Sequence, residues 1–306
     1  MLSLRHLRSA LRGLLLVSCT LSSSQTADFS TPVFRSTVSE VRVTFFATDE
    51  RNHSIDTLKP EEFAVVDNER VVRNFRSFLH SDETALDVVA LVDVSESVAP
   101  RLQVAIKDVL QVVSQEQAVA DENISVLSFG GTRPAIVCSG NCRGARGRDR
   151  LLNVKQGGTT PLFDALVFGA NFVVRRHTPG IRPVIVLFSD GVDTISINSL
   201  RDALTAVMTS GAVIYSVDLN PAQQPSSGST LLEEMATATG GRYFRAQAGI
   251  ANVLKAALED LRASYLVTYQ LPSREVGFHS LRLLPTHNLN LRFHSRNGYY
   301  YENAIR

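Results

Sequence analysis

The chain has 306 residues, of which 44% are hydrophobic and 20% are charged, so it can bury the core of one large domain or two modest ones. Its formal net charge of +1 argues against a protein that binds nucleic acid over its general surface. The basic run from Arg143 to Arg150 is a local exception, and we interpret it as a solvated loop rather than a binding patch.

The first 24 residues have the pattern of an export signal. Arginines precede the apolar stretch 13–17, and small and polar residues follow it through Ser24. The segment from Leu16 to Cys19 also resembles a bacterial lipobox, which implies lipidation of Cys19; simple secretion with a later cleavage is the alternative. No later stretch approaches the ~20 apolar residues of a membrane-spanning helix. We therefore expect an exported protein, periplasmic, surface-exposed or secreted, that meets a membrane only through such a lipid anchor.

The two remaining cysteines, Cys138 and Cys142, lie four positions apart. In an exported chain this spacing predicts a small disulfide loop, with two free thiols as the alternative. A zinc site has little support, because the histidines of the chain show no spacing typical of a metal-ligand pair.

Both ends of the chain are predicted to form β-structure. Alternating or β-branched stretches occur at 38–48, 62–66, 71–75, 265–269, 279–283 and 289–293. The pair Asp67-Asn68 marks a hairpin turn between two of them. Because unpaired strand edges invite aggregation, we expect the C-terminal β segment, 263–306, to pair with the N-terminal β segment, 34–80.

The middle of the chain, 85–262, alternates strands with helices. This order predicts an α/β domain with a doubly wound, mostly parallel, Rossmann-like sheet. We expect strands at 86–93, 124–129, 135–137, 184–188, 213–217 and 242–245, and helices near 102–113, 161–173, 196–209 and 248–262. The α/β domain would then be inserted between the two halves of one small β module.

Oxygen-bearing side chains follow three of the expected elements. Asp93, Ser95 and Ser97 come directly after the first buried strand, Thr160 opens a helix, and Asp190 follows a later strand. In open α/β sheets, ligands bind at the carboxyl ends of the strands, so these side chains are expected to converge there.

The pattern Asp93-x-Ser95-x-Ser97, followed by a Gly-Gly-Thr-Thr-Pro loop and then Ser-Asp190-Gly, resembles the complete metal-ion-dependent adhesion site of von Willebrand factor A domains. The flanks of this region resemble a family of exported proteins that contain von Willebrand factor A (VWA) domains and are frequent in acidobacteria. That likeness rests on the segments 58–67, 265–269 and 295–300, and the whole resemblance covers residues 38 to 301.

The resemblance implies that Ser95, Ser97 and Thr160 coordinate a metal directly, while Asp93 and Asp190 act partly through waters. Two carboxylates and three hydroxyls, without sulfur or imidazole, favour a hard cation such as Mg²⁺, Mn²⁺ or Ca²⁺. We choose Thr160 over its neighbour because it lies six residues before a buried apolar position of the following helix, a spacing usual in the similar family.

An open coordination position on the metal would accept an Asp or Glu carboxylate from an unidentified partner protein, as in related domains. Glu96 and Asp193 lie beside the site and could orient waters or serines, although a solvated loop carboxylate is the preferred role for each.

The sequence does not favour an enzyme. It has no Gly-x-Ser-x-Gly elbow, phosphate-binding loop or His-Glu-x-x-His helix. We expect a metal-dependent protein-binding module, with a metal-independent envelope scaffold as the first alternative and a metal-assisted hydrolase as the second.

Overall fold

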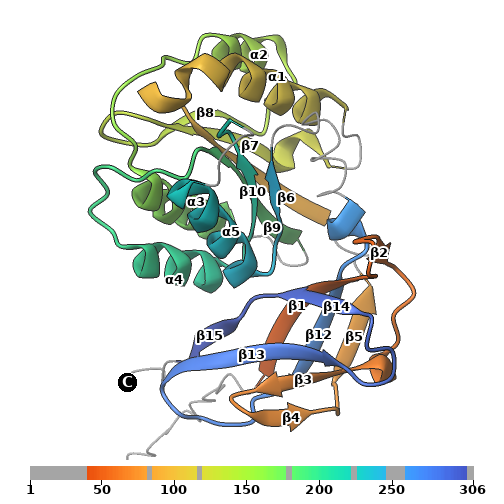
Figure 1. The fold of residues 1–306 in the computed structure, drawn as a ribbon. Coiled ribbons are helices and arrows are strands. Elements are labelled where there is room, and N and C mark those ends of the chain that lie inside the picture. The colour runs from red at the N-terminus through yellow and green to blue at the C-terminus, as the bar shows by residue number, and fades with distance from the viewer. Residues whose placement is uncertain are drawn as a thin grey trace, which may run out of the picture. The chain divides into compact units, whose positions relative to one another are not determined.

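The computed structural model describes residues 40–80, 85–115, 119–176, 181–221, 226–245 and 259–301. The expected export signal with Cys19, and most of the helix expected at 248–262, lie outside these residues. The described residues form an α/β domain and an antiparallel β unit (Figure 1). None of the helices in the described part is both long and apolar enough to cross a membrane.

The α/β domain is built on a six-stranded sheet in the order β11-β10-β9-β6-β7-β8. Its strands are β6 (Ala85–Asp93), β7 (Ile124–Phe129), β8 (Ala135–Ser139), β9 (Ile181–Ser189), β10 (Val213–Asp218) and β11 (Tyr243–Arg245). All neighbours pair in parallel except β7 and β8, which are antiparallel. The sheet is therefore mixed, with one antiparallel strand at its edge.

Helices cover both faces of this sheet (Figure 1). The elements are α1 (Ala99–Gln115), α2 (Ala145–Leu152), α3 (Leu162–Arg176), α4 (Leu200–Ser210) and α5 (Ser227–Thr239), with short 3-10 turns at Pro60–Glu62, Glu96–Val98 and Asp121–Asn123. Alternate residues of a strand point to opposite faces. Val88 and Val92 therefore join one core with α1 and α2, while Val89 and Leu91 join a second core with α3, α4 and α5.

Most of the basic run, residues 145–150, lies in helix α2, so our interpretation of it as a loop is wrong. The three arginines of α2 are exposed, whereas Gly147 and Leu151 are buried one helical turn apart. A Cβ atom at Gly147 would lie 2.6 Å from the carbonyl oxygen of Cys142, so only glycine allows this close approach. Cys138 and Cys142 are joined by a disulfide, and it holds the segment that precedes the helix.

The β unit combines strands from both ends of the described chain. One sheet has the order β14-β1-β12-β5, with β2 also paired to β1, and the other has the order β15-β13-β3-β4. The strands are β1 (Glu40–Thr48), β2 (Ser54–Ile55), β3 (Phe63–Asp67), β4 (Arg70–Val72), β5 (Ser77–His80), β12 (Tyr265–Gln270), β13 (Gly277–Pro285), β14 (Arg292–Ser295) and β15 (Gly298–Tyr301). Apolar and aromatic residues of both sheets form one core, which includes Val43, Phe45, Phe63 and Leu281.

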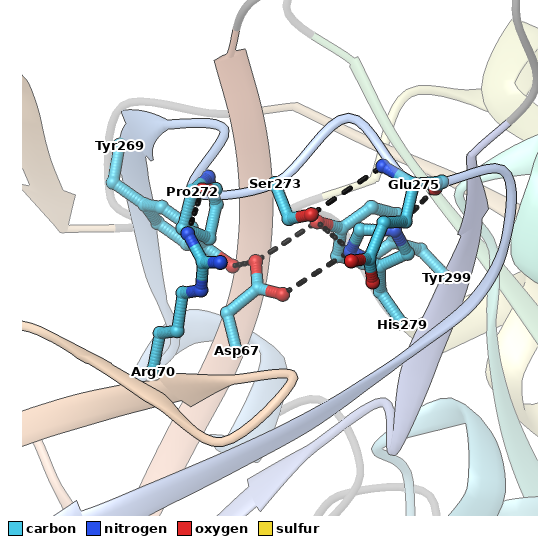
Figure 2. A network of polar contacts seen from close by, with 8 residues as sticks. All are labelled: Asp67, Arg70, Tyr269, Pro272, Ser273, Glu275, His279 and Tyr299. Atoms are coloured by element: carbon cyan, nitrogen blue, oxygen red, sulfur yellow. Dashed lines mark hydrogen bonds and ion pairs between the residues drawn. The ribbon is translucent and has the colours of Figure 1, made fainter.

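A buried polar cluster ties four strands of the β unit together (Figure 2). The Asp67 carboxylate has no exposed surface, and its Oδ2 accepts hydrogen bonds from Tyr269 at 2.7 Å and from Tyr299 at 2.9 Å. Nδ1 of His279 lies 3.5 Å from Asp67 Oδ1. Burial raises the pKa of both tyrosines, so their hydroxyls remain donors. The cluster joins β3, from the N-terminal part, to β12, β13 and β15.

Several strand boundaries differ from the predicted ones. The predicted strand 71–75 is the shorter β4, and the predicted strand 289–293 is displaced to β14, leaving Leu289 exposed. The β3–β4 turn is formed by Asn68 and Glu69, both with positive φ angles, of 47° and 67°. Two consecutive left-handed residues are typical of a type I′ turn, whose twist matches that of a hairpin.

Candidate metal centre

The predicted site lies where two neighbouring parallel strands end. Val92 of β6 is in register with Phe188 of β9, so the next residues, Asp93 and Ser189, are also neighbours. The Ser189 hydroxyl donates a hydrogen bond of 2.6 Å to Asp93 Oδ2. Parallel pairing thus brings the first and third predicted loops together at the carboxyl ends of these two central strands.

The first loop holds its carboxylate and two hydroxyls in a compact arrangement. Asp93 is buried, and its Oδ1 accepts a 2.9 Å hydrogen bond from the amide of Ser95. The hydroxyl oxygens of Ser95, which is buried, and Ser97, which is exposed, are 3.2 Å apart. Burial raises the pKa of Asp93 to about 6, against the opposing effect of its hydrogen bond from Ser189; the nearby charge of Asp190 adds to the rise. A cation at this edge would favour the ionised carboxylate.

The second loop is hydrogen-bonded to the first. The amide of Gly157 donates to the carbonyl of Val94 at 2.9 Å, and the amide of Glu96 donates to the carbonyl of Gly158 at 3.2 Å. Gly158 has a φ of +85°, and a Cβ atom there would lie 2.7 Å from Cα of Gly131. Glycine is required at this position because a side chain would push the second loop away from the turn between β7 and β8.

The two threonines of the second loop have different surroundings. Thr159 is exposed, and its hydroxyl donates to the carbonyl of Gly131 at 3.0 Å. Thr160 is buried at the start of α3. Its amide donates to the Thr194 hydroxyl at 2.7 Å, and the Thr194 amide donates to its carbonyl at 2.9 Å. These two bonds join the second loop to the third.

Asp190, in the third loop, accepts hydrogen bonds at both its side chain and its backbone carbonyl. Asp190 is buried, its Oδ1 accepts a 3.1 Å hydrogen bond from the amide of Val192, and its carbonyl accepts one of 2.7 Å from Asn220 Nδ2. Gly191 has a φ of +76°, and a Cβ atom there would lie 2.2 Å from the carbonyl oxygen of Gly228. The loop after β9 therefore packs directly on the start of α5.

The two neighbouring carboxylates, for which a solvated loop position is the preferred prediction, have different surroundings. Asp193 Oδ1 accepts hydrogen bonds from the Ser196 hydroxyl at 2.5 Å and from the amide of Phe163 at 3.3 Å, so it satisfies the first turn of α3. Glu96 is exposed in the 3-10 turn after the first loop. Sequence reasoning missed Ser189 and Thr194, which join the loops; only the strand register and loop contacts identify them.

The oxygen donors at this edge suit a hard cation. They are the carboxylates of Asp93 and Asp190 and the hydroxyls of Ser95, Ser97 and Thr160. The part of the chain that the structure describes contains no group of three or more His, Cys, Asp or Glu side chains placed to hold a metal. A cation held here would therefore depend on the hydroxyls as well as on the two carboxylates.

The middle of the chain matches a known protein family. Residues 88–192 match the family described as von Willebrand factor type A domain, and this stretch contains all the predicted ligands. No curated protein matches the sequence.

Solved structures that match this chain include those of a mussel protein and a bacterial protein. Proximal thread matrix protein 1 from the mussel byssus is 15% identical with a TM-score of 0.47, and the match covers 59% of this chain and 49% of that one. A second structure of the mussel protein has zinc in its metal-ion-dependent adhesion site (MIDAS) motif. It is 13% identical with a TM-score of 0.46, and the match covers 64% of this chain and 49% of that one. An aerotolerance-related membrane protein from Bacteroides fragilis is 17% identical with a TM-score of 0.44, covering 58% and 98%. The likeness thus spans about half of the mussel chain.

Proposed function

We propose, from the match of residues 88–192 to the von Willebrand factor type A domain, that this chain binds a partner protein through a divalent cation held at the candidate metal centre. The observation that supports the proposal is the hydrogen bonding between the three loops that carry the five predicted oxygen donors. Mg²⁺ is the preferred cation, with Mn²⁺ and Ca²⁺ as alternatives.

The donors take different roles in this proposal. Ser95, Ser97 and Thr160 coordinate the cation through their hydroxyls. Asp93 acts through water and by positioning, because both of its oxygens already accept hydrogen bonds from Ser95 and Ser189. Asp190 completes the set through water. With so few charged ligands, the cation keeps much of its positive charge and attracts an Asp or Glu carboxylate of the partner.

We further propose that the chain is exported and belongs to the VWA-related family that its flanks resemble. The support is the sequence pattern of residues 1–24 together with the flanking segments 58–67, 265–269 and 295–300. Lipidation of Cys19 and simple secretion are both compatible with this proposal. Mass spectrometry of the mature N-terminus distinguishes them, because a diacylglyceryl group on Cys19 adds a defined mass.

Metal-dependent stability tests the proposed site. The melting temperature of residues 25–306 is measured in EDTA and then in millimolar Mg²⁺, Mn²⁺ or Ca²⁺. A ligand at about a hundredfold its dissociation constant adds about 2.7 kcal/mol, which raises the melting temperature by roughly 5–10 °C for a domain of this size. We expect this rise in the wild type and its loss in Asp190→Ala.

A matched variant, Glu234→Ala, removes an exposed carboxylate from α5 and should keep the rise. Partner binding that survives both chelation and Asp190→Ala would contradict a metal-dependent role and favour the metal-independent scaffold. Absence of any metal-dependent rise in the wild type would have the same meaning.

A further inference from the structure

Three large apolar side chains are exposed on the loop that follows Asp190. Val192 is 41% exposed, Ile195 is 40% exposed and Ile197 is 95% exposed. We call these three residues the apolar rim. Single exposed apolar residues are ordinary, but several on one short segment beside polar groups are typical of an interaction surface.

The loop that carries the apolar rim is held in place by the site itself. The amide of Val192 donates to the carboxylate of Asp190 at 3.1 Å. Thr194, next to Ile195, exchanges hydrogen bonds with Thr160. The rim is therefore fixed to two of the proposed metal ligands.

The far end of the loop is fixed as well. The amide of Ile197 donates to both carboxylate oxygens of Asp164 at 3.1 Å, and Asn198 donates to Asp164 Oδ1 from its amide at 2.9 Å and from its side chain at 2.7 Å. Asp164 belongs to the first turn of α3. The loop thus displays its isoleucines to solvent from a backbone that is bonded along its length, which lowers the entropy lost when a partner covers them.

We propose that the apolar rim is part of the partner-binding surface, and that the partner is a polypeptide segment with an Asp or Glu next to a large apolar side chain. This inference rests on the proposed function, because the acidic residue would bind the cation while the apolar neighbour packs on Ile195 and Ile197. The positive charge of the cation would select the acidic residue of the partner, and the exposed isoleucines would select its apolar neighbour. A carboxylate alone would leave the most exposed isoleucine of the described chain uncovered.

A selection with displayed peptides tests this chemistry directly, because it does not require the natural partner. A random dodecapeptide library is bound to residues 25–306 in Mg²⁺ and eluted with EDTA. We expect the selected peptides to be enriched in Asp or Glu with Ile, Leu, Val or Phe within two positions. The best peptide is then synthesised, together with variants in which its acid is changed to Ala or its apolar residue to Ser.

The protein variants separate the rim from the metal. Ile197→Ser should weaken binding of the selected peptide about tenfold. It should not change binding of the peptide whose apolar residue is already Ser, and it should leave the metal-induced rise in melting temperature intact. Because Ile197 is almost fully exposed, this change removes no core packing. Ile136→Ser, at an isoleucine 51% exposed on β8, is the matched control and should leave peptide binding unchanged.

The outcomes are distinguishable. Selected peptides that carry an acid without an apolar neighbour, or an equal effect of Ile197→Ser on both peptides, would overturn the rim while leaving the metal centre in place. Absence of a metal-induced stabilisation, or of any peptide eluted by EDTA, would overturn both proposals. Mg²⁺-dependent self-association that Ile197→Ser abolishes would show that the rim is covered by a second copy, which also overturns a peptide partner.

Discussion

His294 illustrates how burial of a single residue makes stability depend on pH. Its Nε2 lies 3.1 Å from the hydroxyl oxygen of the buried Thr48, and its ring stacks on Phe46. Burial lowers the pKa of His294 to about 4, and the positive charges of Arg242 and Arg292 add to the effect. The folded protein therefore keeps this imidazole neutral under conditions in which an unfolded chain would protonate it.

The consequence is a loss of stability in acid. An unfolded histidine binds its proton near pH 6.5, so between about pH 6.5 and 4 the unfolded state binds more protons and the free energy of unfolding falls as the pH falls. The full effect is about 3 kcal/mol below pH 4. We expect His294→Gln to lose less stability than the wild type between pH 7 and 4.5 in urea titrations. Parallel pH profiles for the two proteins would contradict this assignment.

At the scale of an element, the β3–β4 turn contains avoidable strain. Glu69 has a φ of 67°, which costs a residue with a side chain about 1–2 kcal/mol, whereas glycine adopts it freely. Asn-Gly is also the preferred pair for a type I′ turn. We expect Glu69→Gly to raise the free energy of unfolding by about 1 kcal/mol, measured by urea denaturation. Glu69→Ala is the control and should bring no gain; equal stabilisation by both changes would show that the charge of Glu69, and not its backbone, is responsible.

Elements with a long apolar period were predictable, whereas elements that depend on distant packing were not. The strand at 88–92 and the helix after Thr160 show clear patterns in the sequence. Helix α2 does not, because only Gly147 and Leu151 face the core, and two buried positions are too few to show a helical period. The position of β14 depends on its pairing with β1, where Phe45 is opposite Ser295. No local pattern reports that register.

The same limit applies to the candidate metal centre. The ligand residues could be named from their order along the chain, because a motif records which residues follow each strand. Ser189 and Thr194 join the loops through contacts between segments about 30 to 100 residues apart, so the sequence does not indicate their role. The rim residue Ile197 was missed for a related reason, since exposure is a property of the folded loop.

At the scale of the whole molecule, the β unit depends on segments from both sides of the α/β domain. Asp67 of β3 accepts hydrogen bonds from Tyr269 of β12 and Tyr299 of β15, so it connects residues more than 200 positions apart. Removing the carboxylate would leave the buried hydroxyl of Tyr269 and the partly buried hydroxyl of Tyr299 without this acceptor.

We expect Asp67→Ala to lower the free energy of unfolding of the β unit by about 3 kcal/mol, and Asp67→Asn to lower it less, because an amide oxygen still accepts one hydrogen bond. Urea denaturation followed by tyrosine fluorescence measures the loss. The metal-induced rise in melting temperature of the α/β domain serves as the control and should persist in both variants. A loss below about 1 kcal/mol for Asp67→Ala would show that the cluster contributes little.

The pairing of β5 with β12 affects how the molecule bears load. The chain passes into the α/β domain after His80 and returns from it at Tyr265, and these two residues are paired in the same sheet. Under the proposed function, tension applied by a partner at the candidate metal centre would be shared between these two connections of the chain rather than carried by one. A protease that cuts either connection would leave the α/β domain attached through the other, so on the proposed function a nicked protein would still hold its partner.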